Sequence, residues 1–301
     1  MSILNSKFGL IYSQLKVWFG KKELEIPNIE ILPGIFLVMP VSSNFDTNFR
    51  TNCIVIGTPG EEALIIDPSP FNDTEYKNFL SIIIRIGKTN SFKFSYIVIT
   101  HSHGDHHKNA PRFAKELSIP LIMSQYTLER ITKKKGINYF DGNVIHIVND
   151  GDDINIGKGN FIKVYNIPGH DEGQIGLAPE NMQWFIVGDL IESNRTVVIG
   201  GEEGNMTKYF HSLERVIALS PQWIIPSHGS PLKSVDFLVK TLTHRREREN
   251  QVKNLFLEGQ TPEEIVKSIY RGTDKRLWPL ALENVKAHLK KLKDEGSVKF
   301  E

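Results

Sequence analysis

The sequence predicts a chain of mixed α/β structure, in which a large strand-containing domain precedes a small helical one. Short apolar runs such as residues 94–99 and 184–188 have the length of buried strands and lead directly into polar residues. After about residue 235 the apolar positions follow a helical period, and glycine and proline become scarce. A length of 301 residues is sufficient for both parts. We expect an N-terminal extension at 1–29, a main domain at 30–235 and a C-terminal domain at 236–301.

The first 22 residues predict an amphipathic helix. Leu4, Phe8, Ile11, Leu15 and Trp18 are spaced by four, three, four and three residues, which places them on one helical face. We expect this face to pack on the main domain or on a second copy of the chain in a homodimer. A membrane surface is the weaker alternative, because few basic residues accompany the face.

The polar run that follows residues 94–99 carries the main chemical signal. His101 and His103 are two residues apart, so in an extended backbone both side chains project to one side and can bind one ion. Gly104 allows the chain to turn, after which Asp105 and His106 can bind a second ion. Imidazole and carboxylate ligands without a thiolate favour zinc, with iron or manganese as alternatives. The run therefore predicts a site for two divalent metal ions.

Three later residues occur in similar local settings and complete a set of seven candidate ligands. His170 and His228 each lie on a tight turn after an apolar run, and Asp189 directly follows the strand-like residues 184–188. Asp189 is placed to bridge two ions, whereas Asp67, which ends an earlier apolar run, is expected to orient a ligand histidine. The remaining histidines are interpreted as structural: His107, His146, His211, His244 and His288.

The motif His-x-His-x-Asp-His at 101–106, followed by His170, Asp189 and His228, resembles that of the metallo-β-lactamase-like superfamily over roughly residues 30–235. The resemblance implies a four-layer αββα sandwich with the site at one edge between two β-sheets. It also implies that His101, His103 and His170 bind the first metal. Asp105, His106 and His228 would then bind the second, with Asp189 as the bridge. The single cysteine, Cys53, lies in an apolar run and is expected to be a buried strand residue rather than a ligand.

The C-terminal part predicts three helices and a short wing strand. A long helix is expected at 234–259, a second after a capping box formed by Thr261 and Glu264, and a third at 280–295, with a wing strand at 297–300. This tail resembles the winged helix of the endoribonuclease-like branch of the superfamily. Residues 240–301 hold 14 Lys and Arg against 10 Asp and Glu, a net charge of +4, which permits contact with nucleic acid. A role in packing or dimerisation is the alternative.

Overall composition sets the remaining limits. A net charge of +1 gives no general attraction to nucleic acid, and a single cysteine excludes an internal disulfide framework, as is usual in a reducing compartment. No apolar run is long enough to span a membrane and no signal-peptide pattern is present at the N-terminus, so a cytoplasmic location is expected.

These observations predict a hydrolase that uses a metal-bridging hydroxide, with Asp105 as the proton shuttle to the leaving group. The first candidate substrate is a small ester, thioester or lactone, and the alternative is single-stranded RNA. A non-catalytic metal-binding module is a third possibility. Gln174 stands where nuclease-like relatives usually have a further histidine, and Asp171 and Glu172 would repel a phosphodiester. We therefore favour the small substrate and expect residues 140–142 and 199–206 to determine specificity.

Overall fold

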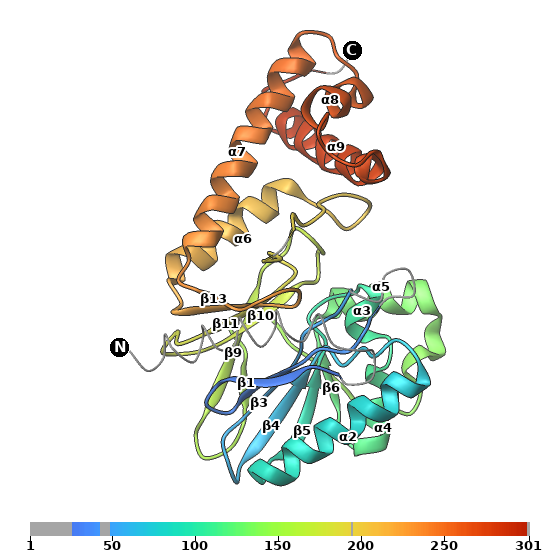
Figure 1. The fold of residues 1–301 in the computed structure, drawn as a ribbon, viewed down its shortest axis with the longest axis vertical. Helices are drawn as coiled ribbons and strands as arrows, with labels where there is room; N and C mark the ends of the chain where they lie inside the picture. The colour runs from blue at the N-terminus through green and yellow to red at the C-terminus, as the bar shows by residue number, and fades with distance from the viewer. Residues whose placement is uncertain (1–25, 43–48, 194, 300–301) are drawn as a thin grey trace.

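The computed structural model describes residues 26–42, 49–193 and 195–299, which fold into two stacked β-sheets with helices on both outer sides (Figure 1). The first sheet has, in the described residues, strands in chain order: β1 (Asn28–Leu32), β2 (Ile35–Val38), β3 (Cys53–Gly57), β4 (Glu62–Ile66), β5 (Lys93–Val98), β6 (Leu121–Met123) and β7 (Ile145–Ile147). Pairing is antiparallel from β1 to β4 and parallel from β4 to β7.

The second sheet is mainly antiparallel. Its strand order is β13 (Leu232–Lys233), β12 (Trp223–Pro226), β11 (Phe185–Gly188), β10 (Ile175–Pro179), β9 (Phe161–Asn166) and β8 (Asp153–Asn155). The exception is the parallel pair β11 and β12, whose carboxyl ends therefore lie at the same edge of the sheet. This parallel pair matters because each of its strands ends just before a candidate metal ligand.

Side chains alternate between layers along the central strands, which explains why these strands are apolar throughout. In β4, Ile65 contributes to the core beneath the first sheet's helices, and Ile66 contributes to the core between the sheets. In β11, Phe185 belongs to the core beneath α6 (Met206–Leu219), and Ile186 lies between the sheets. Both faces of each sheet are thus buried, and such strands are nearly continuously hydrophobic.

Helices complete the four layers. The first sheet is covered by α2 (Asp73–Asn90), α4 (Ala110–Leu117) and α5 (Gln125–Lys135), and the second by α6 and the start of α7 (Asp236–Leu257) (Figure 1). The short elements are α3 (Gly104–His107) and the 3₁₀ helix η1 (Ile137–Phe140). This architecture confirms the expected αββα sandwich, and Cys53 is a fully buried residue of β3, as predicted.

The C-terminal region is helical. The long helix α7 runs from the second sheet into a small cluster with α8 (Pro262–Ile269), η2 (Lys275–Leu277) and α9 (Trp278–Asp294) (Figure 1). The capping box is present, since Thr261 accepts a hydrogen bond from the Glu264 amide while the Glu264 carboxylate accepts one from the Thr261 amide. The third helix begins earlier than expected, at Trp278, because η2 leads directly into it. Residues 297–299 form no strand, and the last residue of the expected wing lies outside the described residues.

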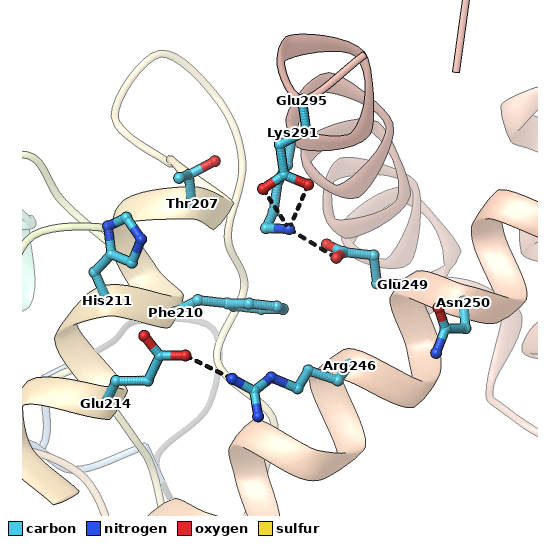
Figure 2. A pocket seen from close by; sticks show the side chains of 9 residues that line it. All are labelled: Thr207, Phe210, His211, Glu214, Arg246, Glu249, Asn250, Lys291 and Glu295. Atoms are coloured by element: carbon cyan, nitrogen blue, oxygen red, sulfur yellow. Dashed lines mark hydrogen bonds and ion pairs between the residues drawn. The ribbon is translucent and has the colours of Figure 1, made fainter. Parts of the chain in front are cut away.

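Some of the basic residues of the C-terminal part have structural contacts in the fold. Arg245 is 2% exposed and donates to the Val197 carbonyl and to Asn284. Figure 2 shows two more of these residues around a cavity of about 390 Å³ between α6, α7 and α9. Arg246 there pairs with Glu214 of α6 at 2.6 Å, while Lys291 pairs within the tail. The Lys291 partners are Glu249, at 2.7 Å, and Glu295, at 2.9 Å.

Two further expectations concern the N-terminal helix and membrane-spanning segments. The amphipathic N-terminal helix falls within residues 1–25, outside the described residues, and stays a prediction. Among the helices that the structure describes, none combines the length and the apolar character that crossing a membrane requires.

Candidate metal centre

The seven predicted side chains come from different strand ends and meet at one edge of the sandwich. His101 and His103 follow β5, whereas Asp105 and His106 lie on the short helix α3. His170 lies in the turn between β9 and β10, and Asp189 and His228 follow the parallel strands β11 and β12. Parallel neighbours deliver their carboxyl ends to the same edge, so this topology brings distant residues together.

The side chains form two adjacent groups, each compact enough to hold one ion. The first contains His101, His103, His170 and Asp189, and the second contains Asp105, His106 and His228, with the candidate ligand atoms in each group within 4.8 Å of one another. In the first, Nδ1 of His103 lies 3.1 Å from Nε2 of His101 and 2.9 Å from Nε2 of His170. In the second, Oδ2 of Asp105 lies 3.5 Å from Nε2 of His106 and 3.3 Å from Nε2 of His228.

Asp189 occupies the centre of the whole cluster. Its Oδ2 atom lies 3.5 Å from Nε2 of His228 and 3.6 Å from the Nε2 atoms of His106 and His170. The corresponding distance to His101 is 3.9 Å. Two ligand atoms, each about 2.1 Å from a tetrahedral zinc ion, are about 3.4 Å apart. Most of these distances match that spacing, so the carboxylate is placed within reach of both groups.

Buried polar atoms in the cluster show that the donor set fits a cation. Nε2 of His106, Nε2 of His228 and Oδ1 of Asp189 have no hydrogen-bond partner among the described residues. A buried polar atom without a partner costs about 1–3 kcal/mol. Divalent metal ions accept nitrogen and oxygen ligands of this kind, and coordination would satisfy all three atoms. The cluster is therefore capable of binding metal.

The Nδ1 atoms of three histidines of the cluster are held by the surrounding chain. Nδ1 of His106 lies 2.9 Å from Oδ2 of Asp67, and Nδ1 of His170 lies 2.9 Å from the Val198 carbonyl. Nδ1 of His228 lies 2.9 Å from the Arg50 carbonyl. An acceptor at Nδ1 keeps the proton there and leaves Nε2 free to coordinate a metal ion.

Asp67 makes the hydrogen bonds expected of a residue that orients a ligand. It is fully buried, and besides His106 it accepts bonds from the Thr100 amide at 2.8 Å and the Thr100 hydroxyl at 2.7 Å. Its backbone is left-handed, with a φ of 51°, which is uncommon outside glycine, asparagine and aspartate. Asp67 thereby connects the end of β4 to the start of the histidine motif.

The His and Asp side chains of the cluster shift one another's pKa values. Burial acts to raise the pKa of Asp189, but the His228 and His106 imidazoles outweigh it and hold that pKa well below its ordinary value. Burial acts to lower the pKa of His228, but Asp189 and Asp105 outweigh it and raise that pKa to about 10. For His101, burial and the neighbouring His106 lower the pKa well below its ordinary value. The Asp189 carboxylate and the His228 imidazole thus each favour the charged form of the other.

Two supporting contacts were not recognisable from the sequence. The Ser102 hydroxyl, between His101 and His103, donates to the buried Asp171 carboxylate beside His170. The Asn52 side-chain amide donates to the carbonyls of Pro226 and Gly229, 2.8 Å from each, on either side of His228. The first contact joins two segments that carry candidate ligands, and the second holds the His228 segment to the start of β3. No local motif marks such pairs.

The structure also corrects the expected effect of residues 171–174. Asp171 does not face incoming substrate, because it is fully buried and accepts bonds from Ser102 and the Gly173 amide. Glu172 pairs with Lys208, and the Gln174 side chain is buried with its amide donating to the Val187 carbonyl. The repulsion of a phosphodiester that was inferred from this segment therefore has no structural basis.

His107 adjoins the motif but lies outside both groups. It is buried, and its Nδ1 atom lies 2.9 Å from the Tyr139 hydroxyl of η1. Burial lowers its pKa to about 3, with Lys135 acting in the same direction. These contacts agree with its interpretation as a structural histidine.

Comparisons with known proteins agree with this architecture. A model of the Metallo-beta-lactamase superfamily matches residues 46–228, and a model of the Beta-lactamase associated winged helix domain matches residues 261–301. A relative from Caenorhabditis elegans named Beta-lactamase-like protein 2 homolog is 29% identical over 82% of this chain and 80% of its own length. An Atrochrysone carboxyl ACP thioesterase from Aspergillus terreus is 23% identical over 90% of this chain and 83% of its own.

Among solved structures, a beta-lactamase domain protein from Burkholderia ambifaria superposes with a TM-score of 0.76 and 20% identity. The match covers 94% of this chain and 93% of that one, so the same fold extends through the C-terminal helices. The superfamily model alone matches more than half of the residues, and the matched range includes all seven residues of the His and Asp cluster. The chain therefore belongs to the metallo-beta-lactamase superfamily.

Proposed function

We propose that the protein is a dinuclear metal-dependent hydrolase of a small ester, thioester or lactone. The observation that carries this proposal is the position of Asp189, whose Oδ2 atom lies 3.5–3.9 Å from four imidazole nitrogens contributed by two adjacent groups. A carboxylate in that position supports binding of two ions close together rather than one. Asp105 completes the second group from a partly exposed position.

The ligand assignment follows the two groups. His101, His103 and His170 would hold the first ion, and Asp189 would contribute to both sites. The second ion would be held by Asp105, His106 and His228. Nitrogen and carboxylate donors in compact groups of this kind favour zinc, with iron and manganese as alternatives. When bound, two such ions lower the pKa of a shared water toward neutrality and polarise the bond under attack.

Asp105 is the residue we assign to proton transfer. Its side chain is 21% exposed, compared with 7% for Asp189, so it can face a substrate that enters the site. Burial acts to raise the pKa of Asp105, but His106 and His228 outweigh it and hold that pKa well below its ordinary value. Asp105 is thus ionised, and the ionised carboxylate is the form that can accept a proton.

The surroundings favour a small substrate over RNA. Arg245 and Arg246 contact the main domain and Lys291 pairs within the tail, so these three side chains are already occupied by contacts within the protein. Relatives that span most of this chain include proteins named as thioesterases. We extend that reaction class to this protein as part of the proposal. Thioester hydrolysis needs the same attack on a carbonyl carbon as ester or lactone hydrolysis.

The proposal is tested with metal-loaded full-length protein and three substrate types: an acyl-thioester series, a lactone and a single-stranded RNA. We expect thioester or lactone turnover that His228→Ala abolishes and that the control His146→Ala, at an exposed residue of β7, leaves unchanged. RNA cleavage with no acyl turnover would contradict the proposed substrate class. Absence of any metal-dependent hydrolysis would contradict the proposed reaction.

A further inference from the structure

A second cavity lies beside the metal centre, on its His228 side. It has a volume of about 300 Å³ and is lined by residues 191–192 and 195–197, which follow β11, and by residues of α7. Apolar side chains form much of the wall, among them Val197 and Phe237. An apolar wall of this size suits the body of a small organic molecule rather than a hydrated ion.

Basic side chains gather at the same cavity, which we call the basic cavity. Arg195, Lys240 and Arg245 line it, and the one carboxylate in its wall is Glu192. Glu192 forms an ion pair with Arg195. The wall also contains His244, whose pKa is lowered by burial and by Arg248 and Arg245, so it adds no positive charge at neutral pH. Two positive charges therefore remain unbalanced within the wall.

Within the described part of the chain, no carboxylate forms an ion pair with Lys240 or Arg245. Lys240 is exposed and has no ion-pair partner among the described residues. Arg245 is 2% exposed, and although two of its nitrogens donate to Val197 and Asn284, its Nε atom has no hydrogen-bond partner in the described part of the chain. A buried charged group with an unused donor is costly unless something else satisfies it. An anion bound in the cavity would balance the positive charge of Lys240 and Arg245.

Contacts connect the basic cavity to the metal centre. The Arg195 guanidinium lies over the Phe49 ring, 4.5 Å from its centre, and the Phe49 ring lies 4.7 Å from the His228 ring. The Arg195 and Phe49 side chains thus place one wall of the basic cavity next to His228.

We propose that the basic cavity binds the anionic end of the substrate that the metal centre hydrolyses, a carboxylate or phosphate attached to an apolar chain. The proposal rests on the proposed hydrolase function and narrows its substrate class. Lys240 and Arg195 are the groups that would contact the anion, and Val197 and Phe237 would pack against the chain that leads to the scissile bond. Lys240 is the better position to substitute, because Arg195 also contacts Phe49 and Glu192.

Binding is measured by calorimetry on the metal-loaded protein with hexanoate, hexyl phosphate and hexanol. The two anions should bind at least about tenfold more tightly than hexanol, and Lys240→Ala should remove about tenfold of that affinity, as expected for one contact to a charged group. The matched control is Lys253→Ala on the same helix, outside the cavity wall, and it should bind like the wild type. Tighter binding of the phosphate or of the carboxylate identifies which anion the substrate carries.

Two matched thioesters separate this proposal from the proposed function when their hydrolysis is measured. One is a thioester of hexanoic acid, and the other carries a free carboxylate at the far end of the acyl chain. Lys240→Ala should raise KM about tenfold for the charged thioester alone, with kcat nearly unchanged. If both thioesters are hydrolysed and Lys240→Ala alters neither binding nor KM, the basic cavity is not a substrate site, although the hydrolase stands. If neither is hydrolysed while the anions still bind through Lys240, the cavity stands and the ester and thioester class is wrong.

Discussion

Replacing Asp67 with asparagine should weaken the second metal position without unfolding the protein. Asparagine tolerates the left-handed backbone found at this position, where φ is 51°, so the turn itself should survive. The new side chain keeps an oxygen for the Thr100 amide, which now donates to Oδ1 at 2.8 Å. It places an NH₂ group where Oδ2 lies 2.9 Å from Nδ1 of His106.

The expected loss of metal affinity follows from placing a donor where His106 needs an acceptor. An NH₂ group cannot accept a proton from Nδ1, so His106 must move its proton to Nε2, the atom that faces Asp105 and Asp189. A protonated Nε2 cannot bind a metal ion. Loss of such an orienting partner typically costs 10–100-fold in metal affinity, or about 1.4–2.8 kcal/mol. Asp67→Ala should be worse, because it leaves several buried donors without an acceptor, at about 1–3 kcal/mol each.

Competition with a chromophoric chelator measures the two metal affinities separately, and thermal unfolding checks the fold. In Asp67→Asn we expect one affinity to fall about 10–100-fold and the other to change less than about threefold. The control is Asp141→Asn, at an exposed residue after η1. If both affinities stay at the wild-type level in a folded Asp67→Asn protein, the orienting role of Asp67 is refuted.

Three further outcomes follow from the same site. His106→Ala and His228→Ala should each lose mainly one of two bound ions, whereas Asp189→Asn should weaken the binding of both ions. Metal content equal to that of the wild type in all three variants, measured by elemental analysis, would refute the ligand set. Asp105→Asn should lower kcat at least ~10²-fold on whichever substrate is turned over, and full activity would show that Asp105 moves no proton. The metal-free protein should lose stability as pH rises from about 6.5 toward 10. The raised pKa of His228 contributes stability below pH 6.5, and this stability is lost as the imidazole deprotonates through about 10. Unfolding temperatures that stay flat over this window, measured with chelator present, would contradict the effect of Asp189 and Asp105 on His228.

The sequence was sufficient to predict which His and Asp residues meet in one cluster because its signals are local. Short apolar runs ended at strand ends, as at β5 and β11, and the spacing of His101 and His103 required only an extended backbone. The capping box at Thr261 and Glu264 was similarly recognisable, since a few neighbouring residues determine it. Features that depend on period and on adjacent residues can be predicted in this way.

The contacts that support the site could not be predicted, because they join residues far apart in sequence. Asp171 was predicted to face the substrate as an acidic residue, whereas the fold buries it against Ser102. Arg245 lies in a charged run typical of a solvated helix face, yet it is buried because α7 packs on the loop that contains Val197. In both cases tertiary packing decides whether a charged side chain meets solvent, and no local pattern records that packing.

The most direct test of the central claim is anomalous diffraction from crystals of the zinc-loaded protein, which locates each ion independently of activity. We predict two peaks about 3.5–4 Å apart, one on each side of the Asp189 carboxylate, as in dinuclear hydrolytic sites. One peak should lie among His101, His103 and His170, and the other among Asp105, His106 and His228. A single peak in fully loaded crystals, or two peaks that do not share Asp189, would contradict the dinuclear site.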